Sequence, residues 1–289
     1  MKKVLITGAN SYIGVNVEKW LSKCPDKYSV ETVDMLDGSW REKNFSTYDC
    51  VYHVAGIAHS DSGKISPEKE KLYRSVNTNL TIETAKKAAA EGVKQFIFMS
   101  SAIVYGDSAP MGKTKMITKN TQPTPNNCYS DSKWQAELGL QKIGGDMKIC
   151  VLRPPMIYGK GSKGNYPILA KLAQKLPVFP KVNNKRSMLY IENLCEFVRL
   201  MIENEEAGVF WPQNKEYSNT TEIVRLIANA HDKKIAVSGA FNWGLYILRL
   251  GTSLVDKAFG SLAYDQKMSE YKEEYRLVDL KESIKRTES

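Results

Sequence analysis

The sequence lacks the residue patterns by which proteins usually hold a metal ion. Its three histidines show no metal-ligand spacing. The five cysteines are odd in number and include no C-x-x-C pair, which favours reduced thiols over a disulfide framework. We therefore predict that the protein has no metal site and is cytoplasmic.

Long apolar runs are also missing. No stretch of about 18 apolar residues is present, so we predict no membrane-spanning segment. The first apolar run, VLITG, is too short for the hydrophobic region of a signal peptide. The nearest candidate, residues 241–260, is interrupted by Arg249, Asp256 and Lys257. We interpret it as an amphipathic helix that is packed, or that contacts a membrane surface or a partner.

Clusters of positive charge are absent as well, although the formal net charge is +9. The basic residues are spread along the chain, with no arginine-rich arm and no zinc-finger spacing. These features argue against binding to nucleic acid. The net charge instead suits small acidic partners such as nucleotides or phosphorylated sugars.

What the sequence does contain is a regular alternation of strand-like and helical segments over its first 160 residues. The predicted strands cover residues 4–8, 29–35, 50–56, 95–101 and 148–154. The predicted helices of this part cover residues 13–23, 80–92 and 129–141. Two later helices are predicted over residues 191–204 and 219–231. Strands that are apolar almost throughout predict an α/β fold with a doubly wound parallel sheet, covered on both faces. After residue 160 glycine and proline interrupt the pattern, which indicates a smaller C-terminal region over residues 161–289.

The turn between the first strand and the first helix reads TGANSYIG over residues 7–14. Gly8 and Gly14, with the small Ser11 between them, approximate the dinucleotide fingerprint. Such a turn lets backbone N–H groups approach a pyrophosphate, which sits at the positive end of the helix. The turn therefore predicts a dinucleotide site.

An acidic residue follows at the distance that this fingerprint requires. Asp34 lies twenty residues beyond Gly14, at the end of the second predicted strand. A carboxylate there holds the adenosine ribose hydroxyls and repels a 2′-phosphate, which favours NAD over NADP. Arg41 and Lys43 lie nearby and can serve a phosphate instead, so NADP stays open.

The stretch NCYSDSK, residues 127–133, places Tyr129 four residues before Lys133. On a helix these two side chains share one face, one turn apart. A free tyrosine has a pKa of about 10, but a neighbouring ammonium and an oxidised nicotinamide favour the phenolate. A drop of about three units, or roughly 4 kcal/mol, would let Tyr129 act as a base near neutral pH.

Six motifs together resemble those of the extended short-chain dehydrogenase/reductases, in their order and roughly in their spacing. They are TGANSYIG, YHVAGIAH (52–59), MSSAIVYG (99–106), YSDSK (129–133), VLRPPMIYG (151–159) and RSMLYIENL (186–194). The chain is most similar to the NAD-dependent epimerase/dehydratase branch, which is UDP-glucose 4-epimerase-like. The resemblance implies that residues 1–160 form an NAD-binding Rossmann domain. It also implies that residues 161–289 form a substrate-binding region, with parts of the chain crossing between the two.

The resemblance assigns roles to individual positions. Ser101, Tyr129 and Lys133 match the catalytic residues of the family. Ser101 and Arg186 match substrate-binding positions, and Arg186 matches an arginine that holds the diphosphate of a nucleotide sugar. The implied cofactor-binding residues are Gly8, Ser11, Tyr12, Ile13, Gly14, Asp34, Ala55, Gly56, Asn77 and Lys133.

The resemblance implies a C4 epimerase of UDP-hexoses that transfers hydride transiently to bound NAD through a 4-keto intermediate. One alternative is an NAD(P)H-dependent reductase of a 4-keto nucleotide sugar in polysaccharide synthesis. Another is a non-catalytic dinucleotide sensor or scaffold, which predicts that Tyr129→Phe leaves function intact. A 4,6-dehydratase is disfavoured because Ala102 and Ile103 stand where that enzyme has Asp-Glu. Family analogy implies a homodimer.

Two positions depart from the family pattern. Met156 falls where many epimerases have asparagine, and Ser187 replaces an aspartate after Arg186. Both lie in motifs that the resemblance connects with the substrate. The motifs therefore leave the sugar and the nucleotide open.

Overall fold

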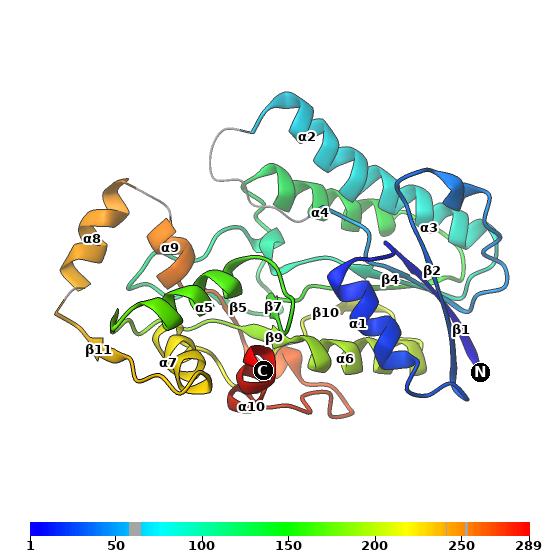
Figure 1. The fold of residues 1–289 in the computed structure, drawn as a ribbon. Coiled ribbons are helices and arrows are strands. Elements are labelled where there is room, and N and C mark those ends of the chain that lie inside the picture. Colours follow the sequence, from blue (N-terminus) through cyan, green and yellow to red (C-terminus); the bar gives the residue numbers. More distant parts are fainter. Residues whose placement is uncertain (58–64, 241, 252–253) are drawn as a thin grey trace. The chain divides into compact units, whose positions relative to one another are not determined.

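The computed structural model describes residues 1–57, 65–240, 242–251 and 254–289 (Figure 1). The chain forms two compact units, each assembled from separate stretches of sequence. The first unit comprises Met1–Gly106, Gln122–Pro154 and Leu194–Pro212. The second unit comprises Asp107–Thr121, Pro155–Asn193 and Gln213–Ser289.

The first unit is built on a six-stranded sheet in the order β10-β6-β4-β3-β1-β2, in which all neighbours are parallel. Its strands are β1 (Lys2–Thr7), β2 (Tyr28–Val33), β3 (Cys50–His53), β4 (Gln95–Met99), β6 (Lys148–Leu152) and β10 (Gly208–Phe210). The chain moves outward from β1 first to β2 and then, on the other side, to β3. The predicted doubly wound parallel sheet is thus confirmed, and its switch point lies between β1 and β3.

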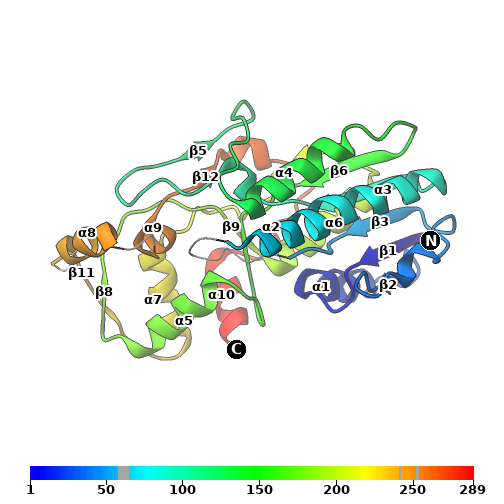
Figure 2. The same ribbon diagram turned by 90° about the horizontal axis from the view of Figure 1, so that it is seen from above.

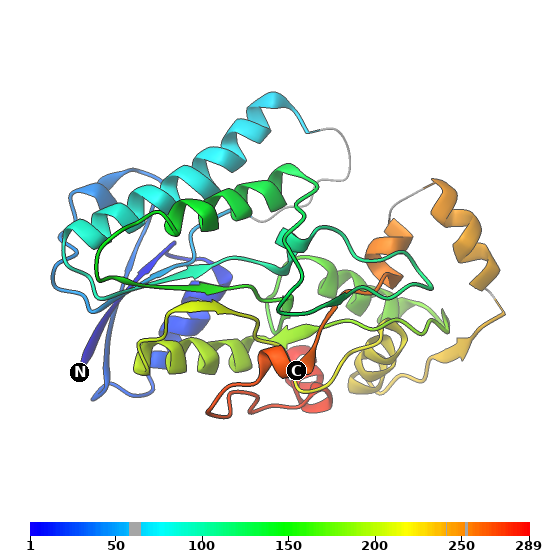
Figure 3. The ribbon, with the colours of Figure 1, turned by 180° about the vertical axis from the view of Figure 1, so that it is seen from behind.

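Helices cover both faces of this sheet (Figures 1 and 3). On one face lie α3 (Leu80–Ala90) and α4 (Cys128–Leu140), and on the other lie α1 (Tyr12–Leu21) and most of α6 (Ile191–Glu203). Seen from above, α2 (Pro67–Tyr73) leads into α3 through a π-helical turn, η2 (Arg74–Asn79), beside α4 (Figure 2). Burial on both sides explains why the strands are apolar almost throughout.

The core between the sheet and the α3–α4 face combines large strand residues with small helical ones. Phe96 and Phe98 of β4 are fully buried. The facing helices contribute alanines, including Ala85, Ala88 and Ala136, which are also fully buried. Small helical residues let the backbone of each helix approach the sheet closely, so large strand side chains fill the space without voids.

The second unit contains three short parallel strand pairs, five α-helices and the 3-10 helix η4 (Gln266–Ser269) among the described residues. The pairs are β7 (Met156–Tyr158) with β9 (Met188–Tyr190), β8 (Val178–Pro180) with β11 (Ala236–Ser238), and β5 (Met116–Ile117) with β12 (Ala263–Tyr264). Its α-helices are α5 (Asn165–Lys175), α7 (Thr220–Ala230), α8 (Asn242–Gly251), α9 (Leu254–Phe259) and α10 (Leu280–Glu288). Helix α7 packs against both α5 and α10.

The segment 241–260, interpreted from sequence as one amphipathic helix, contains two helices, α8 and α9. Phe241 and residues 252–253 lie outside the described residues. On α8, Trp243 and Ile247 are one turn apart and 68% and 60% exposed. Within the described ranges, none of the helices combines the length and the apolar character needed to cross a bilayer.

A buried histidine lies at the end of β3. His53 is fully buried, and its Nδ1 and Nε2 are 2.7 and 3.0 Å from the hydroxyls of Thr7 and Thr81. The Thr81 hydroxyl already donates to the carbonyl of Asn77, so Nε2 donates to Thr81 and Nδ1 accepts from Thr7. Burial, together with the charge of Lys133, lowers the pKa of His53 to about 3.

This neutral histidine predicts a pH-dependent stability. Below pH 6.5 the unfolded chain binds a proton at His53 that the folded chain rejects down to about pH 3. The contribution of the neutral His53 to the free energy of unfolding is therefore complete above pH 6.5. It falls by about 1.4 kcal/mol for each unit by which the pH decreases below that. His53→Gln, which keeps a donor and an acceptor, should reduce this slope in urea unfolding between pH 6.5 and 4. Identical slopes in the two proteins would contradict the prediction.

Candidate active site

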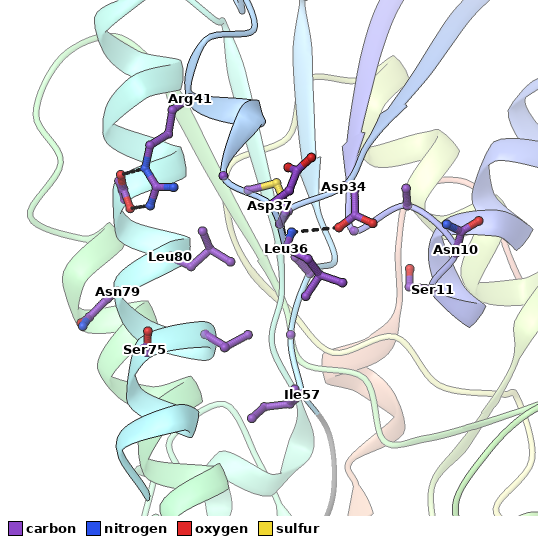
Figure 4. A pocket seen from close by; sticks show the side chains of 18 residues that line it. Asn10, Ser11, Asp34, Leu36, Asp37, Arg41, Ile57, Ser75, Asn79 and Leu80 are labelled. Carbon is purple, nitrogen blue, oxygen red and sulfur yellow. Dashed lines mark hydrogen bonds and ion pairs between the residues drawn. The ribbon is translucent and has the colours of Figure 1, made fainter. Parts of the chain in front are cut away.

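A cavity of about 620 Å³ lies at the carboxyl ends of β1, β2 and β3, next to the switch point of the sheet (Figure 4). Its walls come from the turn after β1, the loop after β2, the segment after β3, and the η2–α3 helix. Open parallel sheets bind ligands at this position, and the volume suits a small-molecule ligand. The lining residues include five of the predicted cofactor residues: Gly8, Ser11, Asp34, Ala55 and Gly56.

The turn after β1 is tightly constrained. Gly8 has φ +93°, and a Cβ there would lie 2.9 Å from the backbone N and Cα of Ala55. A Cβ on Gly14 would lie 2.6 Å from the Ser11 hydroxyl, which caps α1 by accepting from the Gly14 N–H at 3.1 Å. Gly8 is therefore required by its backbone conformation and by the Ala55 backbone, and a side chain at Gly14 would displace the Ser11 hydroxyl. The turn therefore brings the positive end of α1 to the cavity, where it suits a pyrophosphate.

Asp34 lies directly after β2, and its side chain lines the cavity (Figure 4). Its Oδ1 accepts the N–H of Leu36 at 2.8 Å. This hydrogen bond uses part of the acceptor capacity of the carboxylate and fixes its position. The remaining lone pairs can accept ribose hydroxyls.

Tyr12, Ile13, Gly14, Asn77 and Lys133 are not among the cavity-lining residues, although the sequence predicted them for the cofactor. Tyr12 and Ile13 begin α1. Asn77 and Lys133 lie just behind the wall, because a Cβ on Gly56 would lie 3.0 Å from Asn77 Oδ1 and 3.2 Å from Lys133 Nζ.

Asn77 connects the cavity wall to helix α4. It is fully buried, and its Oδ1 accepts the N–H of Ile57 at 2.9 Å. Its Nδ2 donates to the Ile57 carbonyl at 3.1 Å and to the Ser132 hydroxyl at 3.0 Å. One amide side chain thus holds the segment after β3 against the residue that precedes Lys133.

The three predicted catalytic residues belong to the first unit and converge at the end of β4. An Asn127 capping box begins α4, which places Tyr129 in its first turn. The Ser101 side chain lies near enough to Tyr129 to act on the pKa of its phenol. Lys133 is 5% exposed, and its Nζ donates to the Met99 carbonyl at 2.9 Å. The structure therefore brings together the groups that the sequence only placed in order.

In the chain without a cofactor, burial dominates the electrostatics of Tyr129. Burial raises the pKa of Tyr129 to about 12, the nearby Ser101 side chain opposes this, and Tyr73 adds to it. Burial also lowers the pKa of Lys133 to about 8, with the charge of Glu137 opposing. In the chain by itself desolvation decides, so the phenol is protonated at neutral pH. A lowered pKa would have to come from the charge of a bound cofactor.

A buried ion pair that the sequence reasoning missed lies behind these residues. Arg153, at the end of β6, makes a salt bridge to Glu137 of α4 at 2.5 Å. Glu137 is 1% exposed, and it also accepts a hydrogen bond from Ser100, which directly precedes Ser101. Glu137 follows Lys133 by four residues, and this spacing was the available sequence signal.

Arg153 in turn is enclosed by aromatic residues. Its Nη1 donates to the Tyr105 hydroxyl at 2.6 Å, and the guanidinium lies over the rings of Tyr105, Trp134 and Trp211 at 5.2 to 5.9 Å. The Tyr105 hydroxyl also accepts from the Trp211 indole at 2.8 Å. The ion pair is thus satisfied on all sides, as a buried charge requires.

Arg186 belongs to the second unit. Its Nη1 donates to the Ala258 carbonyl at 3.0 Å, and its backbone N–H donates to the Ser218 carbonyl at 3.0 Å. Burial lowers the pKa of its guanidinium. Ser187, which stands where the family has aspartate, is buried and donates to Gln213.

The described residues contain no group of histidines, cysteines or acidic side chains that could hold a metal ion. His59 and Ala58, the last residues of the YHVAGIAH motif, lie outside the described residues. The groups that the structure does bring together at the site are a phenol, a hydroxyl and an ammonium, near a cavity of dinucleotide type.

Comparisons with known proteins agree with this geometry. Residues 4–211 match the model of the NAD dependent epimerase/dehydratase family. The chain is 33% identical over 254 residues to a UDP-glucose 4-epimerase of Vibrio cholerae, which covers 80% of this chain and 76% of that protein. It is 29% identical over 252 residues to N-acetyl-alpha-D-glucosaminyl-diphospho-ditrans,octacis-undecaprenol 4-epimerase of Escherichia coli O157:H7, covering 80% and 73%.

Among solved structures, the fold is similar to that of UDP-glucuronic acid 4-epimerase from Bacillus cereus in complex with NAD. The TM-score is 0.72 at 18% identity, covering 99% of this chain and 95% of that chain. At 18% identity this similarity shows that the two proteins share a fold.

The buried ion pair behind the site makes a stability prediction. Glu137→Gln leaves the Arg153 guanidinium buried without a counter-charge, and we expect the free energy of unfolding to fall by about 3–5 kcal/mol. Combining Glu137→Gln with Arg153→Met removes both charges of the pair and should recover part of this loss, while Lys133 still lacks the charge of Glu137. Urea unfolding measures both. A double variant as unstable as the single variant would contradict the prediction.

Proposed function

Because this chain belongs to the NAD dependent epimerase/dehydratase family, we propose that it is a nucleotide-sugar epimerase that inverts C4 of a UDP-hexose. The observation that carries the proposal is the convergence of Ser101, Tyr129 and Lys133 beside a cavity of dinucleotide type. The relative in Vibrio cholerae, named as a UDP-glucose 4-epimerase, supports the choice of substrate class.

The cavity residues fit NAD. We propose that the turn from Gly8 to Gly14, including Ser11, Tyr12 and Ile13, holds the pyrophosphate, and that Asp34 holds the adenosine ribose. Ala55, Gly56, Asn77 and Lys133 complete the cofactor site, because Gly56 leaves room where a Cβ would crowd Asn77 and Lys133. When bound, NAD supplies a reversible hydride acceptor.

The protein's own groups handle the proton and the oxygen of the sugar. Tyr129 removes the proton of the C4 hydroxyl and later returns it. Ser101, which lies near Tyr129, holds the same oxygen as hydroxyl and as ketone. Lys133 holds the cofactor ribose, and the positive nicotinamide of the bound cofactor favours the phenolate of Tyr129. Because the proton and the hydride are both returned, an epimerase needs no second acid/base pair.

The remaining proposals concern substrate and setting. We propose that Arg186 binds the diphosphate of the substrate, and that the substrate-binding region, residues 161–289, binds the sugar nucleotide. The five free cysteines suit a cytoplasmic enzyme. A homodimer is proposed by analogy with the family.

Removing the phenol should nearly abolish the reaction. We expect Tyr129→Phe to lower the rate of interconversion of UDP-glucose and UDP-galactose by about 10²–10⁴, because proton transfer loses its base. A coupled assay of UDP-glucose formation measures this. Tyr48→Phe is the matched control, since Tyr48 donates to Glu31 away from the site and should keep the wild-type rate. Full activity of Tyr129→Phe would contradict the role of Tyr129, whereas a wild type without any interconversion would favour a sensor or scaffold protein.

The fate of the cofactor separates an epimerase from a reductase. We expect NAD to remain with the purified protein and UDP-sugars to interconvert without net change in nicotinamide absorbance. A stoichiometric loss of NADPH absorbance with a 4-keto nucleotide sugar would contradict epimerisation and identify the protein as a reductase.

The pKa of Tyr129 should respond to the cofactor. Without it the pKa is about 12, so the phenolate fraction rises only in strong alkali. The positive nicotinamide should lower this pKa, so that at any pH below 12 more phenolate is present with NAD⁺ than without. Ultraviolet difference absorbance of wild-type protein against Tyr129→Phe measures the titration. Equal midpoints with and without NAD⁺ would contradict the prediction.

A further inference from the structure

The two cations that follow Asp34 in sequence are both paired with carboxylates. Arg41, in the 3-10 helix η1 (Ser39–Arg41), donates Nε and Nη2 to the two carboxylate oxygens of Glu83 at 2.5 and 2.7 Å. Lys43 donates to Glu31 at 2.9 Å. The sequence offered both cations as binders of a 2′-phosphate, but in the structure each already has an anionic partner.

Arg41 lines the cavity together with Glu83, and Figure 4 shows the two dashed bonds of the guanidinium. Lys43 and Glu31 are not among the described residues that line it. Of the two cations, Arg41 is therefore the one positioned to meet a ligand. Glu83 comes from α3, whereas Arg41 comes from the loop after β2.

Several contacts confine the Arg41 head group. Its Cζ lies 4.6 Å from the centre of the Trp40 ring, and Trp40 is fully buried. A Cβ on Gly38 would lie 3.1 Å from Arg41 Nη1. An exposed ion pair is usually weak, but two parallel hydrogen bonds from one guanidinium to one carboxylate give this pair a defined geometry.

The charge of the cavity wall also disfavours a ligand that carries a 2′-phosphate. Among its described lining residues Asp34, Asp37 and Glu83 are acidic and Arg41 is basic. Hydrogen bonds from Ser39 lower the pKa of Asp37, and the hydrogen bond from Arg41 lowers that of Glu83, so both are ionised at neutral pH. With Arg41 neutralised by Glu83, a dianionic 2′-phosphate would meet two further carboxylates and no free guanidinium in this wall.

We propose that Glu83 is a specificity-determining residue, which by engaging Arg41 withholds that arginine from a 2′-phosphate and makes the cavity select NAD over NADP. The inference rests on the proposed function only in requiring that the cavity binds a dinucleotide. Neutralising Glu83 would free a guanidinium beside the ribose site and remove one repulsive charge. Both changes favour NADP.

Calorimetric titration of the full chain with NAD⁺ and with NADP⁺, after removal of any dinucleotide that co-purifies, tests this. Wild type should bind NAD⁺ more tightly. Glu83→Gln, which keeps the shape of the side chain, should lower the Kd for NADP⁺ by about tenfold, as expected for one new charged hydrogen bond. The Kd for NAD⁺ should change far less. The gain for NADP⁺ should shrink at high salt because both charges are exposed.

Two matched variants identify the cause. Adding Arg41→Gln to Glu83→Gln should abolish the gain for NADP⁺, because the freed guanidinium is gone. Glu31→Gln releases Lys43 by the same kind of change and should leave the ratio of the two Kd values at its wild-type level.

The outcomes against the proposal are distinct. Wild type that prefers NADP⁺, an unchanged ratio in Glu83→Gln, or an equal gain in Glu31→Gln would each overturn the role of Glu83 and leave the proposed function standing. Wild type that binds neither dinucleotide would overturn the proposed function together with this inference.

Discussion

The hydrogen bond from the Lys133 ammonium to the Met99 carbonyl joins helix α4 to the end of β4, and the geometry of the site depends on it. Holding an ammonium out of water is costly, as its lowered pKa reflects, so the surrounding structure has to compensate the charge. The Met99 carbonyl and Glu137 do so, and Arg153 compensates Glu137 in turn. Since Tyr129 stands one turn before Lys133 on the same helix, these contacts also fix the phenol.

On the cofactor side of the site, Asn77 fixes the position of the cavity wall relative to helix α4. It lies in a π-helical turn, a rare conformation that is frequent at functional sites, and its single amide binds both the segment after β3 and helix α4. The cavity wall and the catalytic helix are therefore held at a fixed spacing by a fully satisfied buried group. Such a group specifies one arrangement because every alternative leaves a polar atom unpaired.

Local and global charge have opposite signs in this protein. The chain carries a formal charge of +9, whereas three carboxylates and one paired arginine are the charged groups among the described residues of the cavity wall. A ligand in the cavity responds to the nearby groups, because more distant surface charges are screened within about 10 Å. The net charge thus indicates acidic partners in general. The arrangement of Asp34, Arg41 and Glu83 governs which dinucleotide suits the site.

The sequence by itself determined the parallel sheet and the approximate bounds of its elements, because apolar runs, caps and glycine turns act over a few residues. The five predicted strands of the sheet are present with ends trimmed by a few residues, and only the short edge strand β10 was missed. Tertiary structure alone decided which charges meet. Arg41 and Glu83 are 42 residues apart, and Glu137 and Arg153 are 16 apart on a helix and a strand. It also decided the pKa of Tyr129, because desolvation depends on everything packed around a group and not on its neighbour one turn away.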